Sequence, residues 1–183
     1  MCGLNNKSEV MLIRNNNFAV TPITTHVDIR NISKNLKKGV IINKIKTLNI
    51  WFKKNFKKKP RLGVLGLNPH NAELRKESEE KRLIIPAIQK IKKLGIKING
   101  PLVADTVFIK DYKNYDIIIG MYHDQVLAPF KTIFKFDAIN VTLGLKYLRV
   151  SPDHGVAKNL IRKNKANTLS LEKCISFINK FGR

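Results

Sequence analysis

The stretch Tyr115-Asp-Ile-Ile-Ile-Gly120 decides the fold, together with the loop Met121-Tyr-His-Asp-Gln125 that follows it. A short apolar run that ends at a glycine and a polar loop is typical of a strand buried on both faces of a parallel sheet. A second run of this kind, Arg61-Leu-Gly-Val-Leu-Gly-Leu67, is also followed by a polar loop, which contains His70. Ligands bind beyond the carboxyl ends of such strands in open α/β sheets, so these two loops are the first candidates for a functional site.

Amphipathic helices separate the predicted strands. Apolar side chains recur at helical spacing over residues 39–56, which predicts one long helix. Residues 78–94 carry a second apolar face, in which Pro86 predicts either a kink or a later start. A third helix is predicted over residues 170–181.

Shorter strands complete the pattern. Residues 11–13 and 18–20 flank an Asn-rich turn and predict a hairpin, and residues 96–98 and 138–143 predict two further strands. Residues 99–101, Asn-Gly-Pro, predict a turn. The alternation of strands and helices predicts the α/β class, with a mainly parallel layered sheet that has helices on both faces.

The composition indicates one globular region. At 183 residues and 43% hydrophobic content, residues 1–183 suffice for a single core, and no repeat or linker suggests an internal domain boundary. No run approaches the roughly 20 apolar residues of a membrane span, and the first residues do not resemble a secretory signal. We therefore expect a cytoplasmic protein without a membrane partner. Cys2 and Cys174 have no metal-site or disulfide spacing and are expected to be reduced thiols.

The net charge of +22 raises nucleic acid as a partner. The lysines are scattered, however, and accompany many Ile and Asn residues, as an AT-rich coding sequence would produce. The densest run, residues 52–61, interleaves phenylalanine with lysine, as in a single-strand binder, but its phenylalanines continue a helical spacing. We expect a solvated lysine face and no specific nucleic-acid partner, while salt-sensitive binding through the lysine surface remains an alternative.

Three of the four histidines follow predicted strands. His70 and His123 each stand three residues beyond a buried run, and His26 follows the second strand of the hairpin within Thr24-Thr-His-Val-Asp28. A single loop histidine is more often a surface residue, but three in equivalent places predict a shared divalent metal. Imidazole is a common ligand of such metals, and a site with three protein ligands leaves positions open for substrate. Zinc, magnesium, manganese and cobalt all fit this ligand set.

Two aspartates are candidates for a catalytic role near this metal. Asp105 lies in Val103-Ala-Asp-Thr106, and Asp124 is adjacent to His123. Either carboxylate could orient a ligand or move a proton. A helix N-cap is an equally good interpretation of Asp105.

Five motifs together resemble the 4-hydroxythreonine-4-phosphate dehydrogenase family, in order and in spacing, over nearly the whole chain. They are Gly66-Leu-Asn-Pro-His-Asn-Ala-Glu73, Asn99-Gly-Pro-Leu-Val-Ala-Asp-Thr106, Met121-Tyr-His-Asp-Gln125, Asn140-Val-Thr-Leu-Gly-Leu145 and Arg149-Val-Ser-Pro-Asp-His-Gly155. The resemblance implies a fold of the isocitrate and isopropylmalate dehydrogenase type, from which the N-terminal part of the family is missing. It also implies that His26, His70 and His123 bind the metal.

The resemblance further implies the substrate, the cofactor and the reaction. Lys131, Asn140 and Arg149 would bind a phosphorylated amino acid, and their cationic and amide groups suit its oxyanions. The run Asp153-His154-Gly155 would contact NAD or NADP. The implied reaction is the oxidative decarboxylation of 4-phosphooxy-L-threonine to 3-amino-2-oxopropyl phosphate in pyridoxal phosphate biosynthesis.

The resemblance has consequences for assembly as well. It implies a homodimer whose two subunits share the metal site. The N-terminal half of the enzyme could be a separately encoded partner. A non-catalytic remnant that still binds metal is the alternative interpretation.

Overall fold

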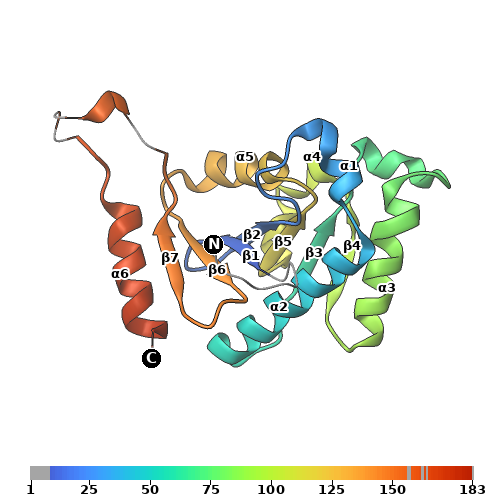
Figure 1. Ribbon diagram of the computed structural model, residues 1–183, viewed down its shortest axis with the longest axis horizontal. Coiled ribbons are helices and arrows are strands. Elements are labelled where there is room, and N and C mark those ends of the chain that lie inside the picture. The colour runs from blue at the N-terminus through green and yellow to red at the C-terminus, as the bar shows by residue number, and fades with distance from the viewer. Residues whose placement is uncertain (1–8, 156–157, 162, 164, 183) are drawn as a thin grey trace.

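A seven-stranded mixed sheet forms the centre of the computed structural model, which describes residues 9–155, 158–161, 163 and 165–182 (Figure 1). The strand order is β4-β3-β5-β2-β1-β6-β7. The strands are β1 (Val10–Arg14), β2 (Ala19–Pro22), β3 (Leu62–Leu65), β4 (Ile98–Leu102), β5 (Ile117–Gly120), β6 (Ile139–Leu143) and β7 (Arg149–Pro152).

The sheet is half parallel and half antiparallel. Strands β4, β3, β5 and β2 pair in parallel, whereas β1 is antiparallel to both β2 and β6, and β6 is antiparallel to β7. The prediction of a mainly parallel sheet was therefore wrong. The physical reason is that β1 connects to β2, and β6 to β7, by short turns, and a short turn can join only antiparallel strands.

Helices cover both faces of the sheet, as predicted. The larger helices are α2 (Lys38–Phe56), α3 (Ile85–Lys93), α5 (His123–Phe134) and α6 (Leu169–Phe181), and the short ones are α1 (Ile32–Asn35) and α4 (Ala104–Val107). Helices α2, α3 and α6 contribute to one apolar cluster, whereas α4 and α5 contribute to the other. Consecutive residues of β5 alternate between these clusters, because successive side chains of a strand point to opposite faces.

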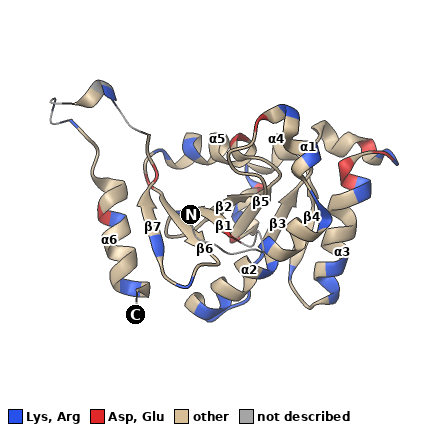
Figure 2. Ribbon diagram, in the orientation of Figure 1, with Lys and Arg blue, Asp and Glu red and all other residues tan. Residues whose placement is uncertain are grey.

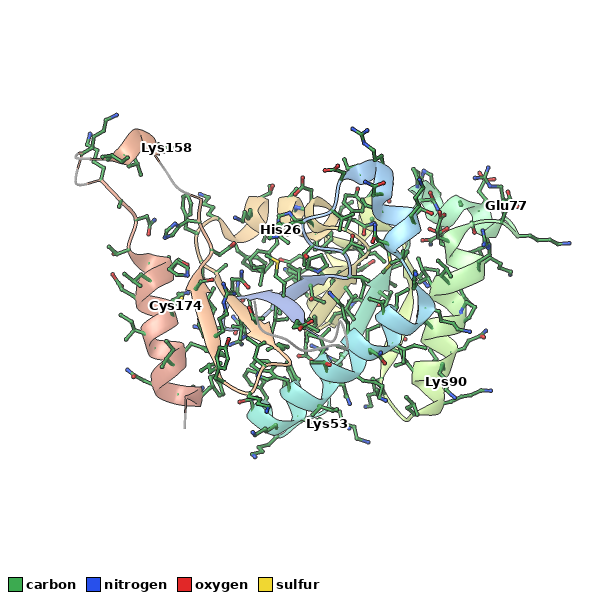
Figure 3. The ribbon with its side chains drawn as sticks, in the orientation of Figure 1. His26, Lys53, Glu77, Lys90, Lys158 and Cys174 are labelled. Atoms are coloured by element: carbon green, nitrogen blue, oxygen red, sulfur yellow. The ribbon has the colours of Figure 1, made fainter. Side chains whose placement is uncertain are left out.

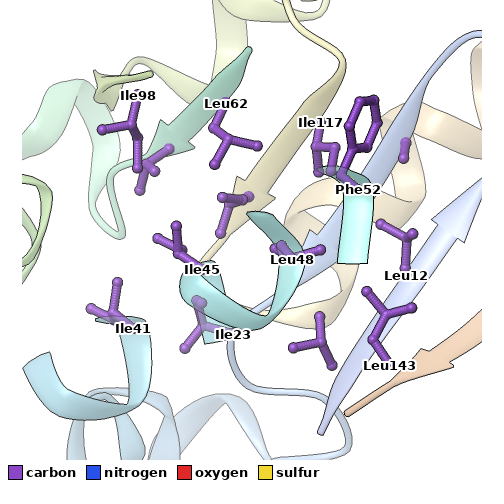
Figure 4. Close-up of a cluster of buried hydrophobic side chains, with 14 of the residues drawn as sticks. Leu12, Ile23, Ile41, Ile45, Leu48, Phe52, Leu62, Ile98, Ile117 and Leu143 are labelled. Carbon is purple, nitrogen blue, oxygen red and sulfur yellow. The ribbon is translucent and has the colours of Figure 1, made fainter. Parts of the chain in front are cut away.

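Helix α2 contributes Ile41, Ile45, Leu48 and Phe52 to the first cluster, where they are buried against the strands (Figure 4). The helix ends where Lys57 adopts a left-handed conformation and donates its N–H to the carbonyl of Lys53. The prediction of a helix over residues 39–56 is confirmed. Its other face carries exposed lysines, among them Lys53, which points away from the sheet in Figure 3.

Two local predictions were wrong. The loop predicted after β5 is only two residues long, because His123 already begins helix α5, whose internal Pro129 obscures the helical pattern. The turn predicted at residues 99–101 is part of β4, which continues through it to Leu102. Pro86 does mark a later helix start, at Ile85, after the π-helical turn η3 (Glu80–Ile84).

Cys174 is a free thiol in a buried position on α6, as expected, and burial raises its pKa. Cys2 lies outside the described residues. Within the part of the chain that the structure describes, no helix is both long and apolar enough to cross a membrane.

Candidate active site

The segments that follow β2, β3 and β5 meet at the carboxyl edge of the parallel strands. Thr24 donates its N–H and its hydroxyl to the carbonyl of Met121, at 3.1 and 2.7 Å. Gln125 accepts the N–H of Met121 at 2.7 Å and donates its side-chain amide to the carbonyl of Gly66 at 2.7 Å. These hydrogen bonds join the three segments, so the loops that carry the histidines start from one rigid edge.

Two of the predicted metal ligands lie side by side. The ring centroids of His26 and His123 are 5.6 Å apart, at a tilt of 39°. His123 uses Nδ1 in a 2.7 Å hydrogen bond with Asp124 Oδ1, which leaves Nε2 available as a ligand. A carboxylate in this position orients a ligating imidazole and raises its basicity. Asp124, one of the two predicted catalytic carboxylates, is thus placed to orient His123.

His70 lies apart from this pair in the structure of one chain. It belongs to the irregular turn η2 (Pro69–Leu74), where it is exposed and adopts a left-handed conformation with φ of 48°. Among the described residues, no group of three or more His, Cys, Asp or Glu side chains is placed to hold a metal ion. One chain therefore brings together two of the three predicted ligands.

Glu80 holds the turn that carries His70, a role that the sequence analysis missed. The fully buried carboxylate accepts the backbone N–H groups of Leu67 and Asn68, both at 2.7 Å, and the side-chain amide of Asn68 at 3.0 Å. Burial opposes ionisation of this carboxyl, but the hydrogen bonds from Asn68 and Leu67 outweigh it and hold the pKa below its ordinary value.

A cavity of about 550 Å³ adjoins His26, and Asn140 and Arg149 contribute to its wall. The guanidinium of Arg149 donates to Thr142 Oγ1 at 2.8 Å. The side-chain oxygen of Asn140 is buried and accepts no hydrogen bond. Two of the three predicted substrate residues thus share one cavity with a predicted metal ligand.

Three lysines that the sequence analysis did not single out also line this cavity: Lys34, Lys37 and Lys44. Lys44 is only 9% exposed, and burial lowers its pKa against the opposing influence of Glu9. A signal for Lys44 was present in the sequence, because it occupies the apolar stripe of α2 between Ile41 and Leu48 at helical spacing. A lysine in that stripe is an exception to the solvated lysine face of the same helix.

The remaining predicted residues lie outside this cavity. Lys131 is exposed on α5 and pairs with Asp153 at 3.3 Å. Arg149 begins β7 and Asp153 follows its last residue, so the strand separates the two by about 13 Å. Asp153 is buried, and its N–H is held at 2.8 Å by Ser170 Oγ, while its Oδ2 has no partner. His154 and Gly155, the next two residues, are exposed, with His154 Nδ1 3.1 Å from the Gly155 carbonyl oxygen.

Asp105 is exposed in the first turn of α4. The N-cap of this helix is Val103, so the alternative interpretation of Asp105 as an N-cap was wrong. The structure shows no contact between Asp105 and the His26–His123 pair among the interactions of its described residues.

Comparison with known proteins decides the family. Residues 3–178 match the family model described as pyridoxal phosphate biosynthetic protein PdxA. The chain belongs to this family. It is 41% identical, over 168 residues, to the 4-hydroxythreonine-4-phosphate dehydrogenase of Aquifex aeolicus, an alignment that covers 90% of this chain and 51% of that protein. The chain spans about half the length of the curated relatives that it matches.

Solved structures support the PdxA fold. The crystal structure of 4-hydroxythreonine-4-phosphate dehydrogenase from Klebsiella pneumoniae matches with a TM-score of 0.80 and 31% identity, covering 92% of this chain and 52% of that one. A terephthalate 1,2-cis-dihydrodiol dehydrogenase from Burkholderia xenovorans matches with a TM-score of 0.77 at 20% identity, covering 97% and 57% of the two chains. The second match shows the fold alone. Because dehydrogenases named for different substrates share this fold, the substrate has to be inferred from the site and not from the fold.

Proposed function

We propose that this chain forms the metal- and substrate-binding part of a dehydrogenase that depends on NAD and a divalent metal. The proposed reaction is the oxidative decarboxylation of 4-phosphooxy-L-threonine to 3-amino-2-oxopropyl phosphate, a step of pyridoxal phosphate biosynthesis in the cytoplasm. The observation that carries the proposal is the position of His26, which lies beside His123 and also lines the cavity that contains Asn140 and Arg149.

The cavity has the charge that a phosphorylated amino acid requires. Arg149 can bind a phosphate or carboxylate with two parallel hydrogen bonds, and Lys34, Lys37 and Lys44 add positive charge to the same wall. The buried oxygen of Asn140 lacks a donor, which the ammonium or hydroxyl group of the substrate can supply. In this interpretation the cations bind the oxyanions of the substrate, while Asn140 orients its amino-alcohol part toward His26.

The donor set fits a divalent metal. His26 and His123 offer two imidazoles, and Asp124 fixes the ring orientation of His123. When bound, the metal would lower the pKa of the substrate hydroxyl and polarise the resulting ketone, which favours both oxidation and loss of carbon dioxide. We propose His70 of a second copy as the third ligand, because it is exposed and does not reach the pair within its own chain.

Asp153 is the residue best suited to a dinucleotide among Asp153, His154 and Gly155. Its Oδ1 is paired with Lys131, while its buried Oδ2 is free to accept a hydrogen bond. NAD, or NADP in its place, would accept the hydride from the substrate. The chain's own contribution is a carboxylate that pairs with Lys131, on a residue whose backbone N–H is held by Ser170 Oγ.

The test is NADH production from 4-phosphooxy-L-threonine by the purified chain with NAD and a divalent metal, alone and with a separately expressed N-terminal part of the family fold. We expect NADH production when both parts and the metal are present. The rate should fall at least 100-fold in a His26→Ala variant and should change little in Lys90→Ala. Lys90 is exposed on α3, far from the cavity lining. Equal rates for His26→Ala and the unsubstituted chain would contradict the proposal.

The lysine surface does not favour a competing function. Among the described residues, Lys and Arg occur on α2, α3, α5 and α6, so the positive charge is distributed over helices on both faces of the sheet (Figure 2). We therefore propose no nucleic-acid partner.

A further inference from the structure

A second cavity lies at the opposite end of β1 from the candidate active site. Met11 lines the first cavity and Arg14 lines the second, three residues or about 10 Å further along the strand. The second cavity encloses about 420 Å³ between the end of β1 and the side chains of Phe56 on α2 and Phe177 on α6.

Arg14 is buried here without a counter-charge. Its side chain belongs to a residue that is 9% exposed, and none of the carboxylates in the described residues forms an ion pair with it. Nη2 donates one hydrogen bond, to the carbonyl of Asn16 at 3.4 Å. Burial lowers the pKa of the guanidinium to about 10. A guanidinium has five N–H donors, so most of its hydrogen-bonding capacity is available to the cavity.

The surrounding rings offset only part of the cost of this burial. The guanidinium carbon lies 4.9 Å from the ring centroid of Phe56 and 5.4 Å from that of Phe177. Cation–π attraction of this kind is weaker than the cost of removing an ion from water. The nearby carboxyl-terminal ends of α2 and α6 also favour a cation, but Arg14 donates no hydrogen bond to their carbonyls among the described contacts.

Further cationic and hydroxyl groups face the same cavity from α6. Lys180, Lys173 and Ser176 line it. Lys173 is neutralised by Asp137, with which it forms an ion pair, whereas Lys180 has no acidic partner among the described residues. Two cations without an acidic partner among the described residues and one hydroxyl thus line the same cavity.

We propose that the cavity between Arg14 and Lys180 is a second ligand site, which binds the oxyanion of a small phosphate- or carboxylate-bearing molecule. The planar fork of Arg14 matches two oxygens of such a group, Lys180 adds a second positive charge, and Ser176 can donate its hydroxyl. Phe56 and Phe177 form an apolar wall for the remainder of the ligand. This site is independent of the proposed enzymatic function, because its residues do not contribute to the first cavity.

The single tryptophan of the chain provides a local probe. Trp51 is edge-on to Phe56 at 5.7 Å and stacks on Phe177 at 6.3 Å, so it contacts both rings that hold Arg14. It does not line the first cavity. Its fluorescence is therefore expected to respond to an anion at Arg14, and not to one at Arg149.

The experiment is a titration of the full chain with potassium phosphate and with potassium acetate, at ionic strength matched by potassium chloride. We expect a saturable change in Trp51 fluorescence with at least one of the two oxyanions, and none with chloride. A preference for phosphate or for acetate identifies which oxyanion the site takes. If neither produces saturation, the proposal is wrong.

Three variants assign the signal to the site. Arg14→Met should weaken binding at least tenfold, and Lys180→Met, which changes an exposed residue and does not threaten folding, at least threefold. Lys90→Met removes one positive charge from α3 and should leave the affinity unchanged (Figure 3). Circular dichroism verifies that each variant is folded. Unaltered affinity in both Arg14→Met and Lys180→Met would overturn the proposal.

Discussion

The imidazole rings of His26 and His123 lie with their centroids 5.6 Å apart at the carboxyl edge of β2 and β5. The parallel pairing of these two strands produces this proximity, since it aligns their carboxyl ends. The hydrogen bonds from Thr24 to Met121 then fix the two loops relative to each other. The strand pairing and these hydrogen bonds thus place the two rings side by side. Whether the two histidines bind a metal can be tested directly.

Removal of either imidazole should weaken metal binding. We expect His26→Ala and His123→Ala each to raise the dissociation constant for Zn²⁺ by at least 100-fold, because each removes an imidazole that binds the metal directly. Asp124→Asn should raise it by about 10-fold, since that side chain only orients His123. Isothermal titration calorimetry measures these constants. His154→Ala is the matched control, as it removes an exposed histidine from another part of the chain. An equal loss in the control would show that Zn²⁺ binds the surface histidines at random.

A mixture of two inactive variants can establish whether two copies share the site. In a shared site, a mixed dimer of His26→Ala and His70→Ala chains retains one complete set, formed by the His26–His123 pair of one copy and His70 of the other. In each mixed dimer one of the two sites should then bind metal. If the two variants pair at random after co-expression, half of the dimers are mixed, so about one quarter of all sites should bind metal. If all three ligands came from one chain, both sites of the mixed dimer would stay incomplete and nothing would be recovered.

The sequence predicted those parts of the site that follow a simple local rule. His26 and His123 could be found because they stand directly beyond apolar strands, where polar residues are conspicuous. The resemblance implied a metal site shared between two subunits, but the spacing did not indicate that His70 is the histidine apart from the pair, because its position depends on the left-handed turn after β3. The contribution of Lys44 to the cavity wall was missed, because all lysines of this helix were interpreted as exposed to solvent.

The fold, like the site, could be predicted only where a local pattern indicates it. Periodicity in α2 and in β5 identified the layers and their buried faces. The antiparallel half of the sheet escaped prediction, since strand direction follows from connections and not from side-chain pattern. Helix α5 was hidden by its short apolar stripe and by Pro129.

Lys44 should bind anions at a cost in stability. A Lys44→Met variant is expected to weaken binding of O-phospho-L-threonine about tenfold, because a buried cation is lost from the cavity. The same change should raise the free energy of unfolding at pH 7 by about 1–2 kcal/mol, since the cost of burying the ammonium exceeds its attraction to Glu9. Calorimetric titration and urea unfolding measure the two effects. Lys46→Met, an exposed position on the same helix, is the control for both. A less stable Lys44→Met variant would contradict this interpretation.

Glu80 should make the chain sensitive to acid. Its pKa is lowered in the folded state, so the ionised carboxylate stabilises the fold above the unfolded-state pKa of about 4.3. That contribution is lost as the pH falls through the folded pKa, because the native state must then take up the proton.

A Glu80→Gln variant removes this titration. The amide retains one acceptor oxygen for the N–H groups of Leu67 and Asn68 but cannot accept all of the present bonds, so we expect a loss of about 1–3 kcal/mol at pH 7. Urea unfolding from pH 7 to pH 3 measures the difference between the two proteins. It should narrow as the pH approaches 3, because protonated Glu80 is also a poorer acceptor. Glu77→Gln changes an exposed carboxylate of the same segment and should leave the free energy of unfolding unchanged at pH 7 and at pH 3. A constant difference at all pH values would show that the shape of the side chain, and not its charge, stabilises the turn that carries His70.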